Sequence, residues 1–328
     1  MYGGRWILVN VKAVTGQPPR TGCQAVVQPR NPLSRSHAPV KTQILSIQST
    51  VAAGFVGNSV AGPVLTALGQ HPLLVDTILL AAHPGYGKRA GGAVPAGIFD
   101  DVLDGLAALT DLSMIGTVIS GYLGSADQVG GIARFIDGWK QAGAGSDAGS
   151  GAGSEARSDA GRYILDPVLG DGGRLYVAPE LADAMVAELL PRADIITPNR
   201  YELSFLSDSP VEDAAAAVTA AHGLIDRFRL QAVIATGIVD GVNGTGDLLV
   251  GAGGDTCWQP ARRDAQNVAG GGDLLTATFA GLVNAGGDTE DAFIRASTLA
   301  QAVIAASPGG RDLALLEHLQ NVAALASG

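Results

Sequence analysis

The fold class follows from residues 162–202, which contain RYILDPVLGD (162–171), PELADAMVAELL (179–190) and DIITPNRYE (194–202). The first and last segments begin with short apolar runs that predict strands, and the middle segment has the apolar spacing of a helix. A strand, a helix and a second strand in succession are typical of a parallel sheet covered by helices. Ligands bind such sheets beyond the carboxyl ends of the strands. We therefore expect the polar residues after these two strands to carry the function.

The same alternation continues on both sides of this unit. A β-hairpin is predicted within 241–258, with turns at Asn243-Gly244 and Gly253-Gly254, and three helices should follow it. The expected fold is thus α/β, with a mostly parallel sheet flanked by helices. Further strands are expected at 42–46, 73–81, 114–120 and 232–236, and further helices at 56–68, 95–109, 126–141, 200–206 and 211–228.

Composition limits the possible partners. The chain has 328 residues, of which 47% are hydrophobic and 16% charged, and its net charge of −10 argues against nucleic acid as a partner. No apolar run approaches the length of a membrane span. Cys23 and Cys257 are too few for a disulfide framework or a cysteine-based zinc site. We therefore expect a cytoplasmic protein that uses neither nucleic acid nor membrane.

Two segments do not follow the alternating pattern. Residues 1–40 combine several prolines and basic residues with little periodicity, and their apolar run is too short for a secretory signal. We expect a disordered N-terminal extension, or a start codon placed too early. Residues 142–161 are rich in Gly, Ser and Ala and cannot bury apolar surface, which predicts a flexible surface insertion. Residues 41–328 should otherwise form a single domain.

A glycine run in the C-terminal third carries the clearest chemistry. Gly270, Gly271, Gly272 and Asp273 directly precede the apolar stretch 274–283, which predicts a helix. Unpaired N–H groups and the dipole at a helix N-terminus favour an anion, and glycines let the backbone approach a phosphate. Asp273 could take a proton from a substrate hydroxyl, so the run suggests phosphoryl transfer to an alcohol. The alternative is a glycine-rich loop in which Asp273 is an N-cap.

A second run, Gly244-Thr245-Gly246-Asp247, has a similar composition. Glycines recur after it, no helical period follows, and it lies in the predicted hairpin. Without a helix behind it, this run lacks the dipole that holds an anion. We therefore expect Asp273, and not Asp247, to be catalytic.

Polar clusters follow four of the predicted strands. Carboxylate oxygens suit Mg²⁺, which keeps several waters and binds substrate phosphates, and Asp171 and Glu202 could reach such an ion mostly through water. Structural roles fit the same residues, because Asn199 and Glu202 have the spacing of a capping box and His83 precedes a Pro-Gly turn. The clusters are Ser46-Ile47-Gln48-Ser49 with Gly54-Phe55-Val56-Gly57-Asn58, His83-Pro84-Gly85-Tyr86-Gly87, 166–172 and 197–202.

Together with Ser120-Gly121-Tyr122 and the run 270–273, these clusters resemble the motifs of pyridoxal kinases in the ribokinase-like superfamily. The resemblance covers about residues 42–325. It implies a ribokinase-like three-layer sandwich and ATP-dependent phosphorylation of the 5′-hydroxymethyl group of pyridoxal. It also implies ATP and Mg²⁺ as cofactors and a homodimer as the assembly.

The resemblance further implies a role for each matched residue. Asp273 would be the base, over an anion hole formed by Gly270, Gly271 and Gly272. Thr236 would contact the nucleotide and 259–262 would border its pocket, while Asp171 and Glu202 would organise the metal. Substrate contacts would come from Ser46, His83, Pro84, Gly85 and Tyr122. Contacts to ATP would come from Asp166, Asp171, Thr197, Asn199, Glu202 and Thr236.

The chain departs from the family pattern at three places. Pro84 stands where many pyridoxal kinases have Thr, and it offers neither a hydroxyl nor an N–H. The stretch 79–82 is more apolar than usual, and 50–53 has smaller side chains. These departures leave open a kinase for another hydroxymethyl heterocycle, such as hydroxymethylpyrimidine. A non-catalytic vitamer-binding protein is a third possibility, although a pure binder would not need Asp273.

Overall fold

The computed structural model describes residues 43–145, 161–242, 244–261, 268–307, 309 and 311–326, all within one compact unit, 39–328. The expected extension, 1–40, lies outside the described residues, as do 146–160 of the expected insertion. Residues 142–145 are described, and they form the last turn of helix α3 (Asp127–Gly145). The prediction of a flexible loop is therefore wrong for 142–145, where alternating alanines allow the helix to continue.

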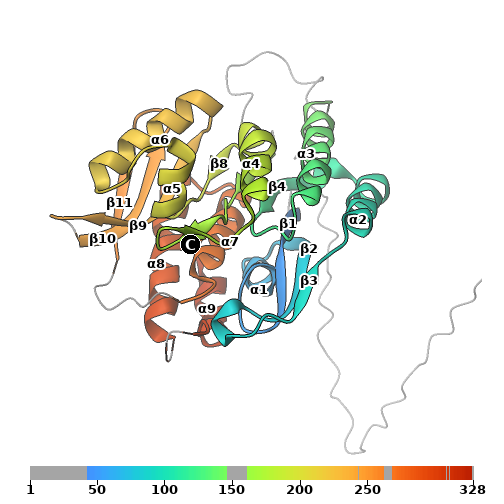
Figure 1. Ribbon diagram of the computed structural model, residues 1–328, viewed down its shortest axis with the longest axis horizontal. Coiled ribbons are helices and arrows are strands. Elements are labelled where there is room, and N and C mark those ends of the chain that lie inside the picture. Colours follow the sequence, from blue (N-terminus) through green and yellow to red (C-terminus); the bar gives the residue numbers. More distant parts are fainter. Residues whose placement is uncertain are drawn as a thin grey trace, which may run out of the picture. The chain divides into compact units, whose positions relative to one another are not determined.

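A nine-stranded sheet lies at the centre of the described part of the chain (Figure 1). Its order is β11-β10-β9-β8-β5-β4-β1-β2-β3, and the inner strands from β9 to β2 all pair in parallel. Antiparallel strands complete both edges. The mostly parallel sheet is thus confirmed. The strands are β1 (Gln43–Ala53), β2 (His71–Ala82), β3 (Gly91–Ala93), β4 (Ile115–Ser120), β5 (Arg162–Leu165), β8 (Ile195–Ile196), β9 (Ala232–Asp240), β10 (Gly244–Gly251) and β11 (Thr256–Pro260).

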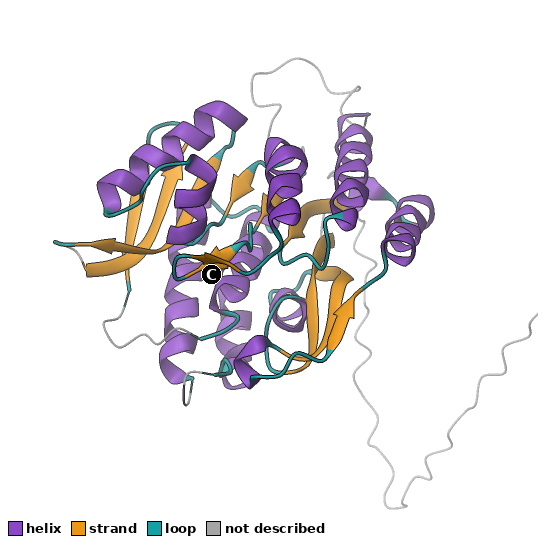
Figure 2. Cartoon of the chain, viewed as in Figure 1, coloured by secondary structure: helices purple, strands orange, loops and turns teal. Residues whose placement is uncertain are grey.

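Helices cover both faces of this sheet (Figure 2). Side chains alternate along each strand, so that Leu45 joins the hydrophobic cluster on one face and Ile44 the cluster on the other. This confirms the three-layer sandwich. The first face carries α2 (Ala96–Leu109), α3, α4 (Pro179–Ala184), α5 (Arg200–Ser207) and α6 (Ala214–Phe228), and the second carries α1 (Asn58–Ala67), α7 (Gly271–Asn284), α8 (Thr289–Ala306) and α9 (Leu315–Leu325).

Two strands are longer than expected. β1 pairs with β4 as far as Ile47, but it continues beside β2 to Ala53 through a register shift between Gln48 and Thr50. The prediction that this strand ends near Ser46 is therefore wrong. The last residues of β1 and β2 pair with each other beyond the end of β4, and β3 pairs with β2 there. β9 likewise continues past Thr236 to Asp240, because Gly237 adopts φ +64° and absorbs the irregularity in its pairing with β10.

Two further details differ from the predictions. The helix expected at 179–190 is α-helical to Ala184 and continues as a π-helical turn (Met185–Leu189) and a 3₁₀ turn (Leu190–Arg192). Pro191 explains the change, because it has no N–H and its ring clashes with the preceding turn. A short hairpin, β6 (Gly170–Asp171) with β7 (Arg174–Leu175), was not expected. None of the described helices has the length and apolar character needed to cross a membrane.

Candidate active site

The glycine run opens helix α7, as predicted. Gly270 is the N-cap residue and adopts φ +90°. A Cβ built on Gly270 would lie 2.1 Å from the Phe55 carbonyl oxygen, whereas a Cβ on Gly272 meets no atom within 4 Å. Only glycine fits at position 270 without movement, and the first turn of α7 faces open space at Gly272. The Gly271 N–H donates to the Val268 carbonyl at 3.3 Å, and the other N–H groups at this helix N-terminus are placed to receive an anion.

Asp273 lies in the first turn of α7, beside the segment that follows β1. Burial raises the pKa of its carboxyl group, and a hydrogen bond from the Gly57 backbone N–H partly opposes this shift. Gly57 adopts φ +53°, and a Cβ there would lie 2.2 Å from the Ser49 carbonyl oxygen. The chain thus brings Ser49, Gly57 and Asp273 together. A carboxylate with a raised pKa is a better proton acceptor than an exposed one.

The carboxylates of Glu202 and Asp273 both act on the carboxyl group of Asp166. Burial raises the pKa of Asp166 well above its ordinary value, and the charges of Glu202 and Asp273 raise it further, while hydrogen bonds from Thr197 and Thr276 oppose the shift. Asp166 directly follows β5, so the cluster lies at the carboxyl edge of the sheet, as expected for a ligand site. The concentrated negative charge would be relieved by a bound cation.

Glu202 and Asn199 form a capping box at the start of α5. Asn199 Oδ1 accepts from the Glu202 N–H at 2.9 Å, and Glu202 Oε2 accepts from the Asn199 N–H at 2.8 Å. Glu202 Oε1 also accepts from the backbone N–H groups of Leu169 and Gly170, at 2.9 and 3.3 Å. The structural role is thus confirmed, and both carboxylate oxygens have donors. Burial nevertheless raises the pKa of Glu202 to about 7, despite these hydrogen bonds.

The other residues expected to contact ATP lie around this box. The Asn199 side chain donates to the Gly170 carbonyl at 2.8 Å, and the half-buried Asp171 follows on β6. The charge of Asp171 adds to the rise in the pKa of Glu202. Thr236 donates its N–H to the Pro198 carbonyl at 2.9 Å and forms a β-bridge with Asn199. The ends of β5 and β8 and the middle of β9 therefore meet at one edge.

Thr197 makes the link from this edge to helix α7. Its hydroxyl oxygen lies 2.9 Å from that of Thr276, which is one turn beyond Asp273. Sequence reasoning did not identify Thr276. Its position three residues after Asp273 on the same helix was the available signal.

Ser46 lies inside the protein and not at a strand end. Its side chain is fully buried, donates to Asn58 Oδ1 at 2.8 Å and accepts from Gln48 Nε2 at 2.9 Å. The expected contact of Ser46 with a substrate ring therefore conflicts with its position in this buried network. Ser49 lies three residues further along the extended strand, beside Gly57. It is the serine of this motif that the structure places next to Asp273, and sequence reasoning assigned it no role.

The turn that contains His83, Pro84 and Gly85 follows β2. His83 is buried, and its Nδ1 accepts from the Gly85 N–H at 3.2 Å. A Cβ on Gly54 would lie 2.9 Å from the His83 ring, so the turn packs against the same 54–57 segment that reaches Asp273. Pro84 is exposed, and it begins a short 3₁₀ turn, Pro84–Tyr86.

Tyr122 is half-buried and packs against Val51, Ile78 and Leu80 of the extended strands. Its carbonyl accepts from the Thr77 hydroxyl at 2.7 Å. A nearby side chain that sequence reasoning missed is Gln128, which is fully buried. Gln128 donates to the carbonyls of Thr77 and Val94 and accepts from the Gly124 N–H, so it fixes the loop of Tyr122 to β2 and β3.

The second glycine run lies in β10, in the antiparallel arrangement that was expected; Asn243, at its first turn, lies outside the described residues. Asp247 is buried, and its carboxylate accepts from the Gly237 N–H at 3.1 Å and from the Ser297 hydroxyl at 2.6 Å. Of the stretch expected to border the nucleotide, Gln259 donates to the Thr298 hydroxyl at 3.1 Å, and Arg262 lies outside the described residues.

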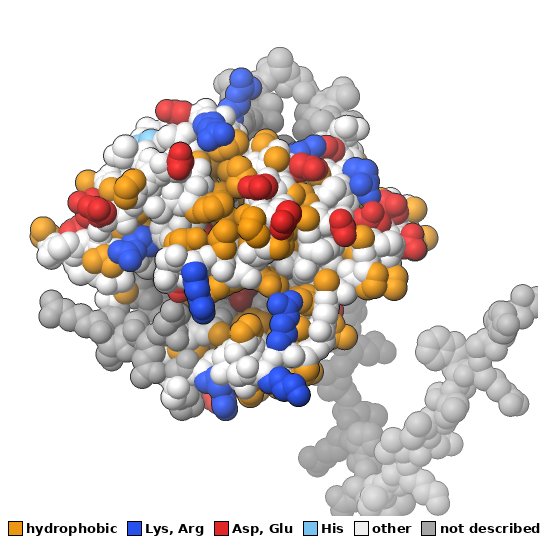
Figure 3. All heavy atoms as spheres, viewed as in Figure 1, with side chains coloured by type: hydrophobic (Ala, Val, Ile, Leu, Met, Phe, Trp, Pro, Cys, Tyr) orange, Lys and Arg blue, Asp and Glu red, His pale blue; other side chains and the backbone are white. Residues whose placement is uncertain are grey.

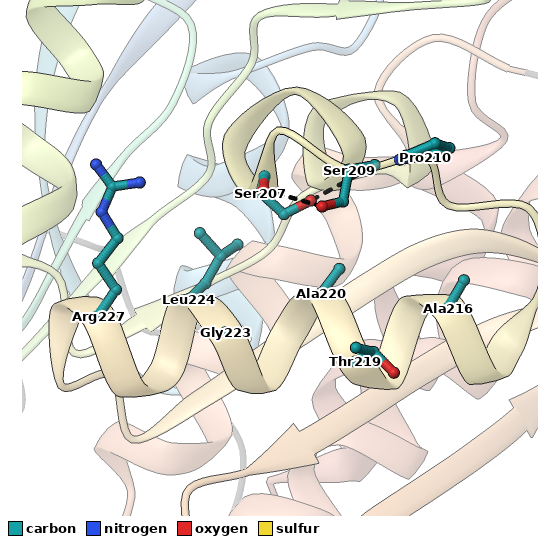
Figure 4. Close-up of a pocket in the computed structure, with 9 residues that line it drawn as sticks. All are labelled: Ser207, Ser209, Pro210, Ala216, Thr219, Ala220, Gly223, Leu224 and Arg227. Carbon is teal, nitrogen blue, oxygen red and sulfur yellow. Dashed lines mark hydrogen bonds between the residues drawn. The ribbon is translucent and has the colours of Figure 1, made fainter.

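A groove of about 330 Å³ lies between the end of α5 and helix α6 (Figure 4). Leu224, Arg227 and small residues line it, and the hydrogen bonds drawn there join Ser207 and Ser209 to each other. It contains none of the residues that the sequence predicts to bind substrate, nucleotide or metal. The candidate site is therefore the cluster around Asp273, and not this groove.

The chain is similar to known kinases over most of its length. Residues 152–313 match the family model described as phosphomethylpyrimidine kinase. A pyridoxal kinase of Deinococcus radiodurans is 33% identical over 257 residues, covering 76% of this chain and 81% of that protein. A pyridoxine/pyridoxal/pyridoxamine kinase of Bordetella avium is 36% identical over 191 residues, covering 58% and 60%.

Solved structures show the same fold. The pyridoxal kinase of Leishmania donovani, in complex with ADP and pyridoxine, superposes with a TM-score of 0.74 at 28% identity and covers 86% of this chain and 95% of its own. The pyridoxal kinase of Entamoeba histolytica gives a TM-score of 0.74 at 27% identity with the same coverage. The shared fold, the length of the match and the Deinococcus identity agree: the chain belongs to the pyridoxal kinase family.

Proposed function

We propose that this chain transfers the terminal phosphoryl group of ATP to the 5′-hydroxymethyl group of pyridoxal, which yields pyridoxal 5′-phosphate and ADP. One observation carries the proposal: Asp273 lies at the N-terminus of α7, directly after three glycines, of which Gly272 faces open space. Family membership and the relatives that were solved with ADP and a B6 vitamer support it.

Asp273 is the base in this proposal. As the hydroxymethyl oxygen forms its bond to the terminal phosphorus, its proton passes to Asp273, and the bond between that phosphorus and the bridging oxygen of ADP breaks. The raised pKa of Asp273 suits this role. We assign Gly270, Gly271 and Gly272 to the anion hole that stabilises the negative charge on the transferred group. The Gly271 N–H also donates to the Val268 carbonyl at 3.3 Å, which holds this turn in place before the reaction.

The edge formed by β5, β8 and β9 holds the nucleotide. We assign Thr197, Asn199 and Thr236 to nucleotide contacts, with Asp166, Asp171 and Glu202 near the phosphates. Lys88 and Arg89 are exposed just after the 83–86 turn, and Figure 3 shows Lys and Arg, with few acidic side chains, on the lower part of the face drawn. Such local positive charge favours the approach of ATP to a chain whose net charge is −10.

Mg²⁺ fits the donors present, provided that water and phosphates supply most of its ligands. Among the described residues, no three His, Cys, Asp or Glu side chains form a group that could hold a metal alone. The buried carboxylate of Asp166 is destabilised by its neighbours Glu202 and Asp273, and a divalent cation would relieve this repulsion. Glu202 and Asp171 would act mainly through water, and the ion would neutralise charge on the phosphates.

The vitamer lies between the 54–57 segment and the turn after β2. His83, Pro84, Gly85 and Tyr122 keep the roles expected for the pocket wall. We assign the hydrogen bond to the ring to Ser49, because Ser46 is enclosed in the buried network with Asn58.

A kinase for hydroxymethylpyrimidine is the second candidate. Pro84 offers the substrate no hydroxyl or N–H, and the matching family model is described as phosphomethylpyrimidine kinase. A third possibility, a vitamer-binding protein without turnover, conflicts with the retained Asp273.

The test is ADP release with pyridoxal, pyridoxine, pyridoxamine and hydroxymethylpyrimidine as acceptors, with mass spectrometry of each product. We expect pyridoxal to give the highest kcat/KM and a product heavier by one phosphoryl group. A higher kcat/KM with hydroxymethylpyrimidine would favour the second candidate. ATP-independent vitamer binding without any phosphorylated product would favour the third.

We also propose that the protein is a cytoplasmic homodimer. Large apolar side chains are exposed on the extended β2 and on α2: Leu79 is 58% exposed, Ile98 59% and Val102 45%. A second copy of the chain would cover such side chains. Light scattering of the purified protein should give twice the mass of one chain, and Leu79→Lys should shift it toward the monomer.

A further inference from the structure

One carboxylate outside the assigned site holds the turn after β2 in place. Asp312 lies just before α9, far along the chain from His83. Its Oδ1 lies 3.1 Å from His83 Nε2, and its Oδ2 accepts from the Tyr86 hydroxyl at 2.7 Å. The two oxygens of Asp312 therefore hold the first and last residues of the same short turn, which contains Pro84 and Gly85 between them.

The hydrogen bonds of His83 define which of its two ring nitrogens carries the proton. Because the Gly85 N–H donates to His83 Nδ1 at 3.2 Å, Nδ1 is an acceptor, and Nε2 must carry the proton that is donated to Asp312. The His83 ring also packs edge-on against Tyr86, with 5.1 Å between ring centroids. His83 is 2% exposed, so its orientation is set by these three neighbours and not by water.

Arg311 supports the same contact from the solvent side. Its guanidinium lies 4.3 Å from the centroid of the Tyr86 ring, and its Nε lies 3.3 Å from Asp312 Oδ2. Burial raises the pKa of Asp312, but the hydrogen bonds from Tyr86, His83 and Arg311 outweigh it and leave the pKa below its ordinary value. Asp312 is therefore an ionised acceptor at neutral pH, and charge-assisted hydrogen bonds of this kind are the strong ones.

The contact also reaches the catalytic helix. A Cβ on Gly54 would lie 2.8 Å from Asp312 Oδ1 and 2.9 Å from the His83 ring, so the 54–57 segment packs directly against the pair. The next residue, Leu313, lies beside Gly270: a Cβ on Gly270 would be 3.0 Å from Leu313 Cδ1. Residues 312–313 thus contact both the turn and the N-terminus of α7.

We propose that Asp312 is a positioning residue of the vitamer pocket: it sets the distance between the His83–Tyr86 turn and the Gly270–Asp273 run, and thereby the position of the substrate's hydroxymethyl group. The inference rests on the proposed function. The hydrogen bonds of Asp312 to His83 and Tyr86 matter more because Pro84, within this turn, offers no hydroxyl that could orient a ligand. Asp312 would therefore affect vitamer binding and not nucleotide binding.

The experiment compares Asp312→Ala, Tyr86→Phe and their combination, with Glu317→Ala as control, since Glu317 is an exposed carboxylate in the first turn of α9. We expect Asp312→Ala to raise KM for pyridoxal about tenfold, while KM for ATP changes about twofold at most. Tyr86→Phe should raise it less, because His83 keeps its bond. The double variant should equal Asp312→Ala, since Tyr86 then has no carboxylate to lose.

Several outcomes would overturn the inference. An unchanged KM for pyridoxal in Asp312→Ala would do so, as would an equal rise in both KM values together with a lower melting temperature, which would indicate a purely structural residue. If Asp312→Ala does not fold, Asp312→Asn retains an acceptor for His83, and Tyr86→Phe must still raise KM for pyridoxal. A wild-type protein without pyridoxal kinase activity would refute the proposed function, and calorimetric binding of pyridoxal would then decide the inference: equal Kd values for wild type and Asp312→Ala would refute it too.

Discussion

Two short runs of this chain, Gly244–Asp247 and Gly270–Asp273, have nearly the same composition and opposite surroundings. Both end in an aspartate whose pKa is raised by burial. Asp247 lies within β10, between two antiparallel partners, and its carboxylate accepts from Gly237 and Ser297. Asp273 lies at the start of a helix, where its charge helps to raise the pKa of Asp166.

The element that contains the glycines explains the difference. In β10 the ladder with β9 and β11 uses backbone N–H groups for pairing. In the first turn of α7 the N–H groups have no partner within the helix, and Gly272 faces open space. In this chain, the run that is followed by a helix is therefore the better candidate for an anion site.

The largest effect should come from Asp273→Ala. We expect kcat for pyridoxal to fall by about 10²–10⁴-fold, because the base is lost, while ATP still binds. The melting temperature should stay close to that of wild type, because removing a carboxylate that burial disfavours offsets the loss of the acceptor of the Gly57 N–H. Steady-state kinetics, ATP calorimetry and thermal melting measure these three quantities. A kcat close to wild type would reopen the case for Asp247.

Alanine substitutions at Gly270 and Gly272 should have different effects on stability. Gly270→Ala should destabilise the fold by about 2 kcal/mol or more, since it forces a side chain into a left-handed backbone and toward the Phe55 carbonyl oxygen. Gly272→Ala is the matched control, because its Cβ meets open space. It should melt near wild type and, by narrowing the anion site, lower kcat. Equal melting temperatures for the two variants would contradict the geometry of this turn.

Asp247→Ala should mainly affect stability. It leaves the buried Ser297 hydroxyl and the Gly237 N–H without their acceptor, which costs about 1–3 kcal/mol for each such group. Below the melting transition, kcat should stay within a few-fold of wild type. Denaturant unfolding and kinetics on the same sample check both expectations. A large loss of kcat without a loss of stability would mean that the β10 run takes part in chemistry.

The smallest effect should be on the pH dependence of stability, and it should come from Glu202. Burial raises the pKa of Glu202 from 4.5 to about 7, so between these values the folded protein holds a proton that the unfolded chain has released. The contribution of Glu202 to the free energy of unfolding therefore falls as pH rises from about 4.5 to about 7. Glu202→Gln cannot ionise and should show a smaller change in melting temperature between about pH 5 and about pH 8.

Glu317→Gln, on an exposed carboxylate, is the control and should keep the wild-type dependence. If the melting temperatures of wild type and Glu202→Gln change equally with pH, the buried environment that we assign to Glu202 is contradicted.

Much of the fold was predictable, because apolar period and turn residues are local signals. The strand Arg162–Leu165 lies at the start of segment 162–171, where the apolar run predicted it, and the glycine run opens a helix as expected. The strand bounds that failed depend on pairing between distant segments or on the conformation of one glycine. The extension of β1 beyond Ser46 is set by its partner β2, and the continuation of β9 depends on the conformation of Gly237, which the sequence alone does not reveal.

The site shows the same division. Asp273, Glu202 and Asn199 were identified from local motifs, and the structure brings them to one edge of the sheet. Ser46 was favoured over Ser49 because the strand was expected to end there, so an error of a few residues in one strand moved the assignment. Asp312 gave no local signal, since its partners His83 and Tyr86 lie more than two hundred residues away in sequence.

The central claim is that Asp273, and not Asp247, accepts the proton of the substrate's hydroxymethyl group. The most direct test is the single-turnover rate of pyridoxal phosphate formation in Asp273→Asn and Asp247→Asn, two isosteric changes that each remove one carboxylate. We predict a loss of about 10²-fold or more in Asp273→Asn, and a rate within a few-fold of wild type in Asp247→Asn. Near-wild-type turnover in Asp273→Asn, or an equal loss in both variants, would contradict the account.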